Sequence, residues 1–319
     1  LIPLVKYHML KPKFSLTWLY EWNFYKKLND VSLFHIQYGT NKYPLDQLKE
    51  VGYKPNIICS FHGHDAVFPI HGYIENDKYY DLLFKNAKSV VVNTPYLKQN
   101  IKDLNCPSQK IMQIPVSVDT KKFRLIKKVK KSAVFRLITV GRLNKSKGHI
   151  YMLKAIQKII SDVQIKLIIV GDGPERFALD SYINQNNLQN YVFLVGAKSQ
   201  DEIVKLHHNS DLFLFTSEVP LNKRMSTETQ GLAISEAMSC GLPVICFDSG
   251  GVRFTFEHNK SGFLILDNNV SFLVQRILEL NQNRDLLRDM GKEARIFTEA
   301  NYSDDIIRAK WKTLYTEMV

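Results

Sequence analysis

The chain has 319 residues, of which 45% are hydrophobic and 23% charged, and its net charge is +12. This length and composition are typical of a soluble globular protein with two hydrophobic cores. No apolar run approaches the ~18 residues that span a bilayer, the first residues lack the pattern of a signal peptide, and the four cysteines lack disulfide-framework or metal-ligand spacing. We therefore expect a two-domain protein of the reducing cytoplasm.

The positive charge is concentrated in the first part of the sequence. Residues 1–131 hold 21 basic and 10 acidic side chains, a net of +11, whereas residues 132–319 have a net of +1. Seven of these basic residues lie in Lys121–Lys131. Such a surface favours anionic membrane lipid, a phosphorylated acceptor or nucleic acid. A nucleic-acid binder also needs aromatic stacking platforms, and this segment offers only Phe123, so we expect peripheral contact with an anionic membrane and no nucleic acid.

Helices and strands alternate through residues 1–130, which predicts a parallel sheet in a first domain. Aromatic and apolar residues recur at helical spacing in residues 11–28. We interpret this segment as a helix that covers a sheet, rather than one that lies on a membrane surface, because an apolar strand follows at once. Strands are expected at 31–37, 56–61 and 89–93 and near Ile111, and helices at 45–51, 78–87 and from Pro95, with Thr94 as the N-cap.

A second alternating series predicts a second domain at residues 131–300. The lysine-rich stretch before it has no apolar period and is interpreted as a linker. The expected strands are 135–140, 165–170, 191–195, 212–216 and 244–247, and the expected helices are 150–160, 176–185, 201–207 and 231–240. The predicted fold class is therefore α/β with two doubly wound domains, whose ligands should bind at the carboxyl ends of the strands.

One helix of the second domain is flanked by two carboxylates, Glu228 and Glu236. Gly231 precedes good helix formers, and Gly241–Pro243 ends the helix. Backbone amides near Gly231 and Leu232 would be free to bind a phosphate, and carboxylates accept hydrogen bonds from hydroxyl groups. A nucleotide diphosphate sugar has this layout. An acid that favours the helix dipole, together with a solvated glutamate, explains the pattern equally well.

Two glycine-containing turns follow strands of the second domain. In the loop Gly141–Gly148, Arg142 supplies a fork of donors and Lys147 a point charge, two complementary ways to hold a diphosphate. We favour phosphate binding over a solvated basic loop because the loop lies between a strand and a helix. The turn Gly171–Glu175, which includes Gly173, lacks the third glycine of a dinucleotide fingerprint, and a tight turn with a capping aspartate explains it equally well.

The first domain offers one candidate of its own, His62, in a strand-end loop beside Gly63. A histidine near neutrality can donate a hydrogen bond to a sugar hydroxyl or to a developing phosphate charge, although a lone histidine is usually structural. Asp65 either orients His62 or ends the turn. The sequence has no Asp-x-Asp, His-Glu-x-x-His or Cys-x-x-Cys motif, so we expect no metal and no cofactor, with leaving-group charge stabilised by Arg142, Lys147 and helix amides.

In this order, the motifs resemble those of the retaining GT-B glycosyltransferases of family four, in particular the branch of colanic acid and other bacterial exopolysaccharide enzymes. The resemblance runs from about Val31 to the end of the chain. It is carried by Phe61–Asp65, Val118–Asp119 with Phe123, Val140–Leu143 with Lys147–Gly148, Val170–Glu175, Glu228 and Glu236 with Ala237–Met238, and Gly241–Val244. It implies two Rossmann-like domains that face a cleft, and a last helix at residues 301–319 that crosses back to the first domain.

The resemblance also implies a role for each candidate residue. Arg142 and Lys147 bind the donor diphosphate. Glu228 contacts the donor sugar, Glu236 holds the ribose hydroxyls, and His62 lines the cleft near the transferred sugar. We accordingly assign catalysis to His62, Arg142, Lys147 and Glu228. The remaining expected donor-binding residues are Gly173, Gly231, Leu232 and Glu236.

The implied activity is metal-independent, retaining transfer of a sugar from a nucleotide diphosphate sugar to a lipid-linked or polysaccharide acceptor. Surface polysaccharide biosynthesis at the inner face of the cell membrane is the implied setting. An epimerase or a phosphorylase of the same fold, or a non-catalytic partner that binds nucleotide sugars, are the alternatives. Product analysis separates them.

The sequence departs from the family pattern in several places, among them Ser117 at a usual glycine, Arg253–Phe254 at a usual Pro-Glu, and the three that follow. The apolar strand and glycine-rich loop that begin family members are absent ahead of Val31, so we expect the first domain to lack its first strand. Thr229 stands where a glycine usually follows the first glutamate. The loop Ser217–Thr227 is longer than usual, and we hypothesise that it closes over the ligand or touches the acceptor.

Overall fold

The computed structural model describes residues 2–10, 16–67, 78–126, 133–218, 228–266 and 268–319. They form two compact units, the first made of the residues up to Pro115 together with Arg308–Val319, and the second of the residues from Val116 to Ile307. This division lies earlier than the boundary at residue 130 that the sequence suggested. The reason is that Val118 and Phe123 are buried in a cluster with Cys240, which assigns the start of the expected linker to the second unit.

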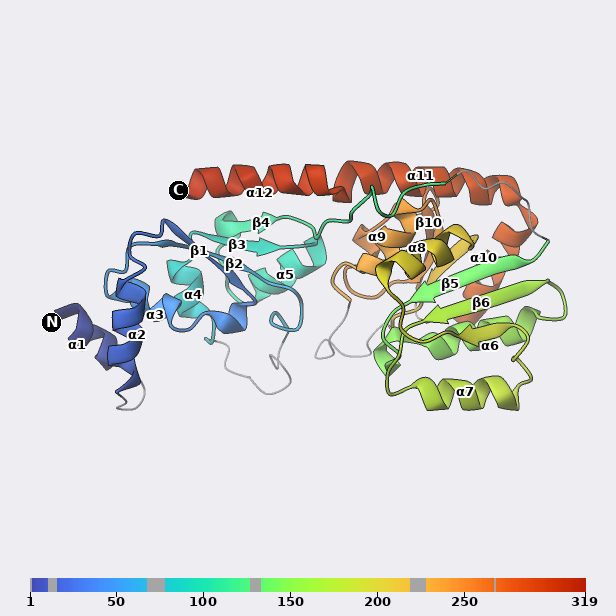
Figure 1. Cartoon of the computed structure of the whole chain (residues 1–319), viewed down its shortest axis with the longest axis horizontal. Helices are drawn as coiled ribbons and strands as arrows, with labels where there is room; N and C mark the ends of the chain where they lie inside the picture. Colours follow the sequence, from blue (N-terminus) through green and yellow to red (C-terminus); the bar gives the residue numbers. More distant parts are fainter. Residues whose placement is uncertain (1, 11–15, 68–77, 127–132, 219–227, 267) are drawn as a thin grey trace. The chain divides into compact units, whose positions relative to one another are not determined.

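The first unit contains a four-stranded parallel sheet in the order β1-β2-β3-β4. Its strands are β1 Leu33–Gln37, β2 Asn56–Ser60, β3 Ser89–Val92 and β4 Ile111–Gln113. Its helices are α1 Ile2–Met9, α2 Thr17–Lys26, α3 Leu45–Glu50, α4 Asp81–Asn86 and α5 Pro95–Asp103, with short 3₁₀ turns η1 Gly39–Asn41 and η2 Ser108–Lys110 (Figure 1). In residues 2–10 and 16–32 the structure has helices and no strand ahead of β1, which is an edge strand.

The local sequence explains these elements. The side chains of β3 are buried along its whole length, as the apolar run Val90–Val92 requires of a strand covered on both faces. Thr94 caps α5 by accepting a hydrogen bond from the Leu97 amide at 3.3 Å, and Pro95 is the first helical residue, as predicted. Of the helix expected at residues 11–28, residues 11–15 lie outside the described part of the chain, and the rest is observed as α2, whose aromatic residues pack against the core of the first unit as a covering helix should.

Helix α12, Asp304–Met318, ends in the first unit. The rings of Trp311 and Tyr315 lie 4.9 and 5.8 Å from that of His35 on β1, and the Tyr315 hydroxyl is 2.7 Å from His35 Nδ1. The Asn56 side chain donates a hydrogen bond to the Met318 carbonyl at 2.7 Å. Within the described ranges, no helix is both long and apolar enough to cross a membrane.

The second unit contains a six-stranded parallel sheet in the order β10-β9-β8-β5-β6-β7. Its strands are β5 Phe135–Val140, β6 Ile165–Val170, β7 Val192–Leu194, β8 Leu212–Phe215, β9 Val244–Phe247 and β10 Gly262–Ile265. Its helices are α6 His149–Ile159, α7 Arg176–Gln185, α8 Gln200–His208, α9 Leu232–Ser239, α10 Val270–Gln282 and α11 Arg284–Tyr302, with 3₁₀ turns η3 Lys145–Lys147 and η4 Val252–Phe254.

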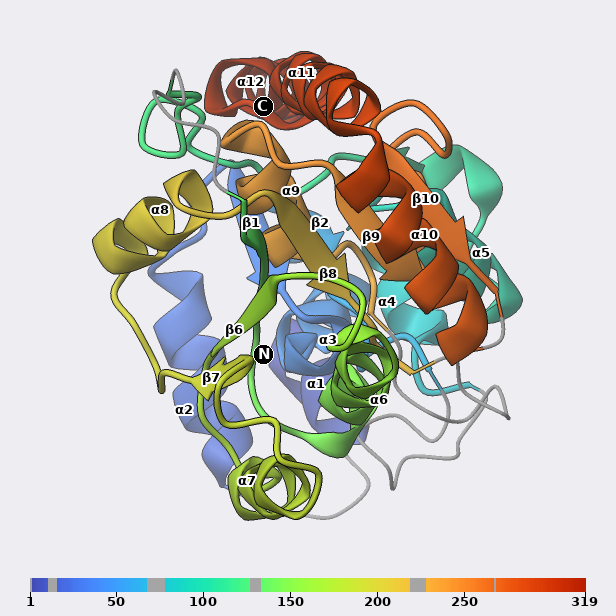
Figure 2. The ribbon, with the colours of Figure 1, turned by 90° about the vertical axis from the view of Figure 1, so that its right-hand side faces the viewer.

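Helices cover both faces of this second sheet. Residues of α6, α7 and α10 pack in one core cluster and residues of α8 and α9 in another, and α11 contributes residues to both. In Figure 2, α6 and α7 lie to one side of the strands and α8 and α9 to the other. The doubly wound architecture predicted for this part is therefore observed.

The sequence prediction missed the end of the second sheet. The prediction took residues 244–247 as the last strand of the sheet. The structure has a sixth strand, β10, which pairs with β9 and is followed by α10 and α11. β10 has four residues and begins with Gly262, which weakens a strand pattern. The glycine is required here because a side chain would collide with the Val244 carbonyl of β9.

Candidate active site

The direction of the strand order reverses between β5 and β8 in the second unit, since β5 pairs with both β6 and β8. In open α/β sheets, ligands bind outside the carboxyl ends of the strands at such a switch point. The loop Gly141–Gly148 follows β5, and Thr216 follows β8. Gly148 has φ +61° and lies against the Thr216 carbonyl, and the Thr216 hydroxyl donates a hydrogen bond to the Gly148 carbonyl at 2.8 Å. The two loops therefore meet at the switch point.

Asn144 shapes the first of these loops. Its side-chain oxygen accepts hydrogen bonds from the Lys147 amide at 3.2 Å and from the Ser146 hydroxyl at 3.0 Å. The resulting 3₁₀ turn leads directly into α6. Lys147 is thus held by its own backbone at the entrance to a helix, while Arg142 is exposed at the start of the loop.

The second glycine turn, Gly171–Glu175, packs against the loop Gly141–Gly148 and forms hydrogen bonds with it. The Leu143 amide donates to the Asp172 carbonyl, and the Glu175 amide donates to the Leu143 carbonyl, both at 2.9 Å. Gly173 has φ +157°, and a side chain on it would collide with the Leu143 carbonyl. This packing accounts for Gly173 without a ligand, and its role in donor binding stays a prediction.

The structure brings together Lys147 and Glu228, which are 81 positions apart. The Lys147 ammonium forms an ion pair with the Glu228 carboxylate and lies 5.3 Å from the centre of the Phe215 ring. The side chains are 27% and 20% exposed, so the pair is partly shielded from water but open to a ligand. Two of the residues predicted to bind the donor are therefore direct neighbours.

The Glu228 carboxylate also accepts a hydrogen bond from the Gly231 amide, at 3.2 Å. Gly231 has φ +73° and precedes α9, as predicted. The expectation of a free amide at Gly231 is wrong, because the Glu228 carboxylate at the positive end of this helix already accepts its hydrogen bond. A phosphate at this amide would have to displace the carboxylate. Leu232, the first residue of α9, is 43% exposed.

Gln230, between these residues, was missed by the sequence prediction. Its side chain accepts a hydrogen bond from the Val116 amide and donates one to the Val116 carbonyl, both at 2.8 Å. Its own carbonyl accepts a hydrogen bond from the Thr255 hydroxyl. The Glu228 carbonyl likewise accepts from the Gly251 amide at 2.8 Å. The segment that carries Glu228 is therefore fixed at both ends, by a partner 114 positions away that no local pattern signals.

Glu236 lies on α9 and is half-buried. Burial raises the pKa of its carboxyl group, and the positive charge of Lys122 partly opposes this shift. A carboxylate in such a place gains from hydroxyl donors, because hydrogen bonds replace the water that burial removed.

In the first unit, Asp65 decides the structure of the His62 loop. Its buried carboxylate accepts hydrogen bonds at 2.9 Å from the backbone amides of His62, Gly63 and Gly39. Of the two roles considered for Asp65, the structure shows one that fixes the backbone of the turn. The His62 ring is held by Gln37, whose side-chain oxygen is 2.8 Å from His62 Nε2.

The environment of His62 favours the uncharged form of its imidazole. Burial lowers the pKa of its imidazole, the charge of Asp65 opposes this shift, and His64 adds to it. Because the Gln37 oxygen can only accept, the hydrogen bond assigns the proton of the neutral ring to Nε2. The Tyr38 ring lies 4.5 Å from the His62 ring, and Tyr38 has φ +65°. Sequence reasoning missed Gln37 and Tyr38, although both stand at the end of a strand.

The sequence-predicted residues of the second unit thus lie on loops or helix starts that follow β5, β6 and β8, except Glu236, which lies more than one turn into α9, and His62 lies in the first unit. Residues 219–227, most of the loop expected to close over the ligand, lie outside the described part of the chain.

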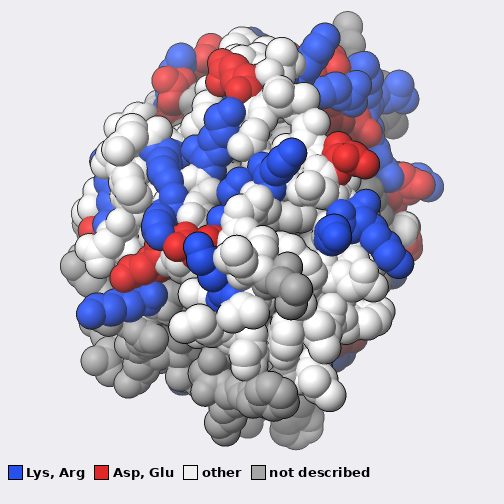
Figure 3. Space-filling view, turned by 90° about the vertical axis from the view of Figure 1, so that its left-hand side faces the viewer, with Lys and Arg blue, Asp and Glu red and all other residues white. Residues whose placement is uncertain are grey.

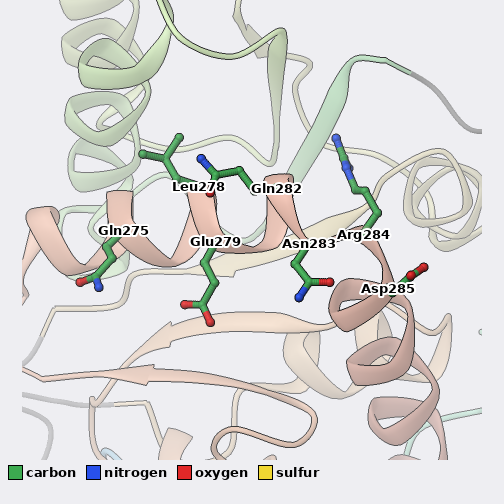
Figure 4. A pocket seen from close by; sticks show the side chains of 7 residues that line it. All are labelled: Gln275, Leu278, Glu279, Gln282, Asn283, Arg284 and Asp285. Atoms are coloured by element: carbon green, nitrogen blue, oxygen red, sulfur yellow. The ribbon is translucent and has the colours of Figure 1, made fainter.

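A hollow of about 850 Å³ lies elsewhere on the second unit, on α10 and the start of α11. Its lining side chains leave the helices in different directions and do not converge (Figure 4). One of them, Arg284, stacks 4.2 Å from the centre of the Phe135 ring. Phe135 begins β5, so this hollow lies at the amino ends of the strands, the edge opposite the motif loops.

Comparison with known proteins defines the class. Residues 121–297 match the family described as glycosyl transferases group 1. The match covers more than half of the chain, and the protein belongs to this family. Its fold is the GT-B fold with two Rossmann-like domains. The family expected from the motifs is confirmed.

Several curated proteins of this family are similar to the chain, and two of them are named for amylovoran and colanic acid biosynthesis. The chain is 27% identical over 279 residues to the amylovoran biosynthesis glycosyltransferase AmsK of Erwinia amylovora, a match that covers 87% of this chain and 67% of the relative. It is 26% identical over 237 residues to WcaL of Escherichia coli, named for colanic acid biosynthesis, with 74% and 58% covered. A third match, to N-acetyl-alpha-D-glucosaminyl L-malate synthase of Bacillus anthracis, spans 45% of that relative at 28% identity. The chain thus spans about half to two thirds of the length of these curated relatives.

Solved structures share the fold at lower identity. A crystal structure of HepE from Anabaena in complex with UDP superposes with a TM-score of 0.80 at 18% identity, covering 92% of this chain and 81% of that one. Sucrose-phosphate synthase from Thermosynechococcus elongatus superposes with a TM-score of 0.76 at 20% identity, covering 95% and 78%.

Proposed function

We propose that the protein is a glycosyltransferase that moves a sugar from a nucleotide diphosphate sugar to a lipid-linked or polysaccharide acceptor. The observation that carries this proposal is the ion pair between Lys147 and Glu228 at the switch point of the second sheet. A cation for phosphate and an acceptor for hydroxyl groups stand side by side where an α/β sheet binds its ligand. The relatives AmsK and WcaL are named for amylovoran and colanic acid biosynthesis, which supports a role in making a bacterial polysaccharide; we place this role at the inner face of the cell membrane.

When the donor binds, Lys147 and Glu228 each exchange the other for a group of the donor. The diphosphate takes the Lys147 ammonium and the Arg142 guanidinium, which releases Glu228 to accept hydrogen bonds from the donor sugar. The Gly231 amide, released from the same carboxylate, turns to a phosphate oxygen. Glu236 accepts hydrogen bonds from the ribose hydroxyls. The ligand-free pairing keeps both charges compensated until the donor arrives.

In the transfer step, the bond between the anomeric carbon and the phosphate oxygen breaks, and a bond from the acceptor oxygen to the same carbon forms. The acceptor proton goes to the leaving phosphate on the same face, which retains the anomeric configuration. Lys147 and Arg142 stabilise the charge that develops on the diphosphate, so no metal is needed. His62, with its ring proton on Nε2, donates its hydrogen bond to a hydroxyl of the transferred sugar in place of the Gln37 oxygen.

A panel of nucleotide sugars in a thermal-shift assay identifies the donor, because a ligand that binds the folded state raises the melting temperature by mass action. We expect one or two nucleotide sugars to stabilise the protein and Glu228→Ala to abolish both the shift and the transfer. Chromatography of the products then tests the reaction. A glycoside supports transfer, whereas a free hexose epimer or a sugar phosphate would assign an epimerase or a phosphorylase, and stabilisation without turnover a binding partner.

The metal requirement is tested separately. Transfer measured with and without excess EDTA should give equal rates, because two protein cations carry the leaving-group charge. A loss of activity that Mg²⁺ or Mn²⁺ restores would contradict this part of the proposal and leave the transfer reaction in place.

A further inference from the structure

A chain of hydrogen bonds connects α12 to His62. The Tyr315 hydroxyl on α12 is 2.7 Å from Nδ1 of His35 on β1, a residue 280 positions away. The Gln37 side-chain nitrogen lies 3.1 Å from His35 Nε2, and its side-chain oxygen lies 2.8 Å from His62 Nε2. These four residues, which we call the relay, all belong to the first unit. The relay thus places a glutamine, a second histidine and a tyrosine behind the residue that is assigned to the sugar.

The two ends of the Gln37 amide have different roles. Its oxygen can only accept a hydrogen bond, and its nitrogen can only donate one. Because the oxygen faces His62, the nitrogen meets His35 Nε2, which must be the ring nitrogen without a proton. The proton of His35 is then on Nδ1, where the Tyr315 hydroxyl oxygen accepts its hydrogen bond. The Ser60 hydroxyl, 2.7 Å from His35 Nε2, can donate to the same bare nitrogen.

The relay requires an uncharged His35, because a protonated imidazole donates from both of its nitrogens. Burial lowers the pKa of His35, and the nearby charge of His62 lowers it further. The relay contains no lysine, arginine or carboxylate side chain. Figure 3 shows such charged side chains at the surface, on the side on which α1 and α2 lie in Figure 1. The direction of the relay is therefore set by hydrogen-bond donors and acceptors and not by an ion pair.

Turning the Gln37 amide over would change His62. The amide nitrogen would then face His62 Nε2, which could accept its hydrogen bond only if the ring proton moved to Nδ1. In that form, Nε2 cannot donate to a sugar hydroxyl. The hydrogen bond at one ring nitrogen of a histidine selects the tautomer of the ring. The tautomers of His35 and His62 are therefore coupled through Gln37.

We propose that His35 is a positioning residue for the transfer reaction, which fixes the direction of the Gln37 amide and thereby keeps the proton of His62 on Nε2. Tyr315 acts one step further back, by accepting the hydrogen bond of His35 Nδ1. A sugar hydroxyl that replaces the Gln37 oxygen then meets a histidine already in its donating form, and such preorganised donors need no rearrangement during the reaction. The inference rests on the proposed function in one respect, because His62 is assigned to the transferred sugar there.

Nitrogen-15 NMR of the imidazole rings tests the relay without any substrate. The protein is labelled in its nine histidines, and the signals of His62 are those that disappear in His62→Ala. In the wild type, at a pH well above the ordinary pKa of histidine, we expect a protonated Nε2 and a bare Nδ1 on His62. His35→Phe keeps an aromatic ring against Trp311 and removes both ring nitrogens. The Gln37 amide then loses its preferred direction, and His62 should become a mixture of the two tautomers.

Transfer kinetics give the second readout. His35→Phe should lower kcat roughly threefold to tenfold, which is less than the loss for His62→Ala, and leave the KM for the donor unchanged. Gln37→Glu supplies a carboxylate that accepts through either oxygen and needs no partner to orient it. In the double variant, His62 Nε2 should therefore keep its proton. There, His35→Phe should lower kcat by less than about twofold relative to Gln37→Glu alone.

The matched control is Trp311→Phe. The Trp311 ring lies 4.9 Å from the His35 ring and takes part in none of the hydrogen bonds of the relay, so this substitution changes only the packing around His35. It should keep the wild-type tautomer and kcat. If circular dichroism shows that His35→Phe does not fold, Gln37→Met makes the same test, because it removes both ends of the amide at an exposed position. It should give the same mixture of tautomers.

The outcomes separate this inference from the proposed function. An unchanged His62 tautomer in His35→Phe would overturn the inference. So would a mixture of tautomers that persists in the double variant or that appears equally in Trp311→Phe, because packing would then control His62. Mixed tautomers with an unchanged kcat would overturn the positioning role and leave sugar transfer in place. A protein without transferase activity would overturn the proposed function and the positioning role with it, whereas the NMR signals would still decide whether His35 controls the tautomer of His62.

Discussion

The two units carry functional groups at the carboxyl ends of parallel strands in different ways. In the second unit, backbone hydrogen bonds among the loops after β5, β6 and β8 hold the site, and Lys147 and Glu228 form an ion pair with each other that stays open to a ligand. In the first unit, a charge holds the loop, because the Asp65 carboxylate ties down three backbone amides. The charged side chains of the candidate site are thus not needed to fold the second unit, whereas the charge of Asp65 is needed to fold its loop in the first unit. Substitutions of charged residues should have opposite consequences in the two.

The largest effect on chemistry is expected from Lys147→Ala. Removing a cation that meets the developing phosphate charge should lower kcat/KM by about 10²–10³. The melting temperature should change little, because the loop is held by Asn144 and by backbone contacts. Kinetics with the donor found by thermal shift, together with circular dichroism, measure both.

The control for this variant is Lys145→Ala, an exposed lysine two positions away on the same loop. It should keep wild-type kinetics. Equal losses in both variants would mean that the loop needs only a general positive charge, and wild-type rates in Lys147→Ala would remove Lys147 from the site.

The converse is expected for Asp65→Ala in the first unit. Its removal leaves the buried amides of Gly39, His62 and Gly63 without their acceptor, which should cost about 3 kcal/mol of unfolding free energy. Urea denaturation followed by tryptophan fluorescence measures this loss. Asp81→Ala, at an exposed position that begins α4, should be nearly neutral. An Asp65 variant as stable as the wild type would contradict the contrast between the units.

His62→Ala tests the part of the first unit that meets the substrate. Because Asp65 holds the backbone and Gln37 only the ring, the loop should remain folded. We expect transfer to fall roughly tenfold to a hundredfold, as for the loss of one positioned hydrogen-bond donor. The nucleotide's thermal shift should be unchanged, since the nucleotide is assigned to the second unit. A shift lost together with activity would place His62 in nucleotide binding instead.

The smallest effect is expected from Glu236→Gln. This variant should fold more stably than the wild type and bind the donor more weakly. Burial raises the pKa of this carboxyl group, so the wild type loses stability as the pH rises from the ordinary value of 4.5 through the raised pKa. At pH 8 the glutamine variant should be more stable, by up to about 1 kcal/mol, and the gain should vanish at low pH. Donor affinity should fall about tenfold. Denaturation at both pH values and calorimetric titration measure the two effects, and a less stable variant at pH 8 would refute the argument.

Much of the fold followed from local pattern. The strands at residues 135–140, 165–170 and 244–247 were predicted with the observed bounds, because apolar runs between turn residues define buried parallel strands. The bounds of the helix at residues 176–185 were also predicted correctly. β10 was missed, since a short strand that begins at Gly262 has almost no pattern of its own. Thr94 and Pro95 marked the start of α5 correctly, because capping is local chemistry.

In the candidate site, too, some features followed from local sequence and others only from contacts between distant parts of the chain. The sequence by itself determined which residues could act: Arg142 and Lys147 in one strand-end loop, and Glu228 and Glu236 around one helix start. It did so because each motif lies within a few residues and needs only backbone geometry and side-chain chemistry. Only the tertiary structure decided that Lys147 pairs with Glu228 across 81 positions, that Gln230 anchors to Val116 across 114, and that Asp65 binds the Gly39 amide across 26. Such contacts depend on which strands become neighbours in the sheet, and that order is fixed by packing of the whole core.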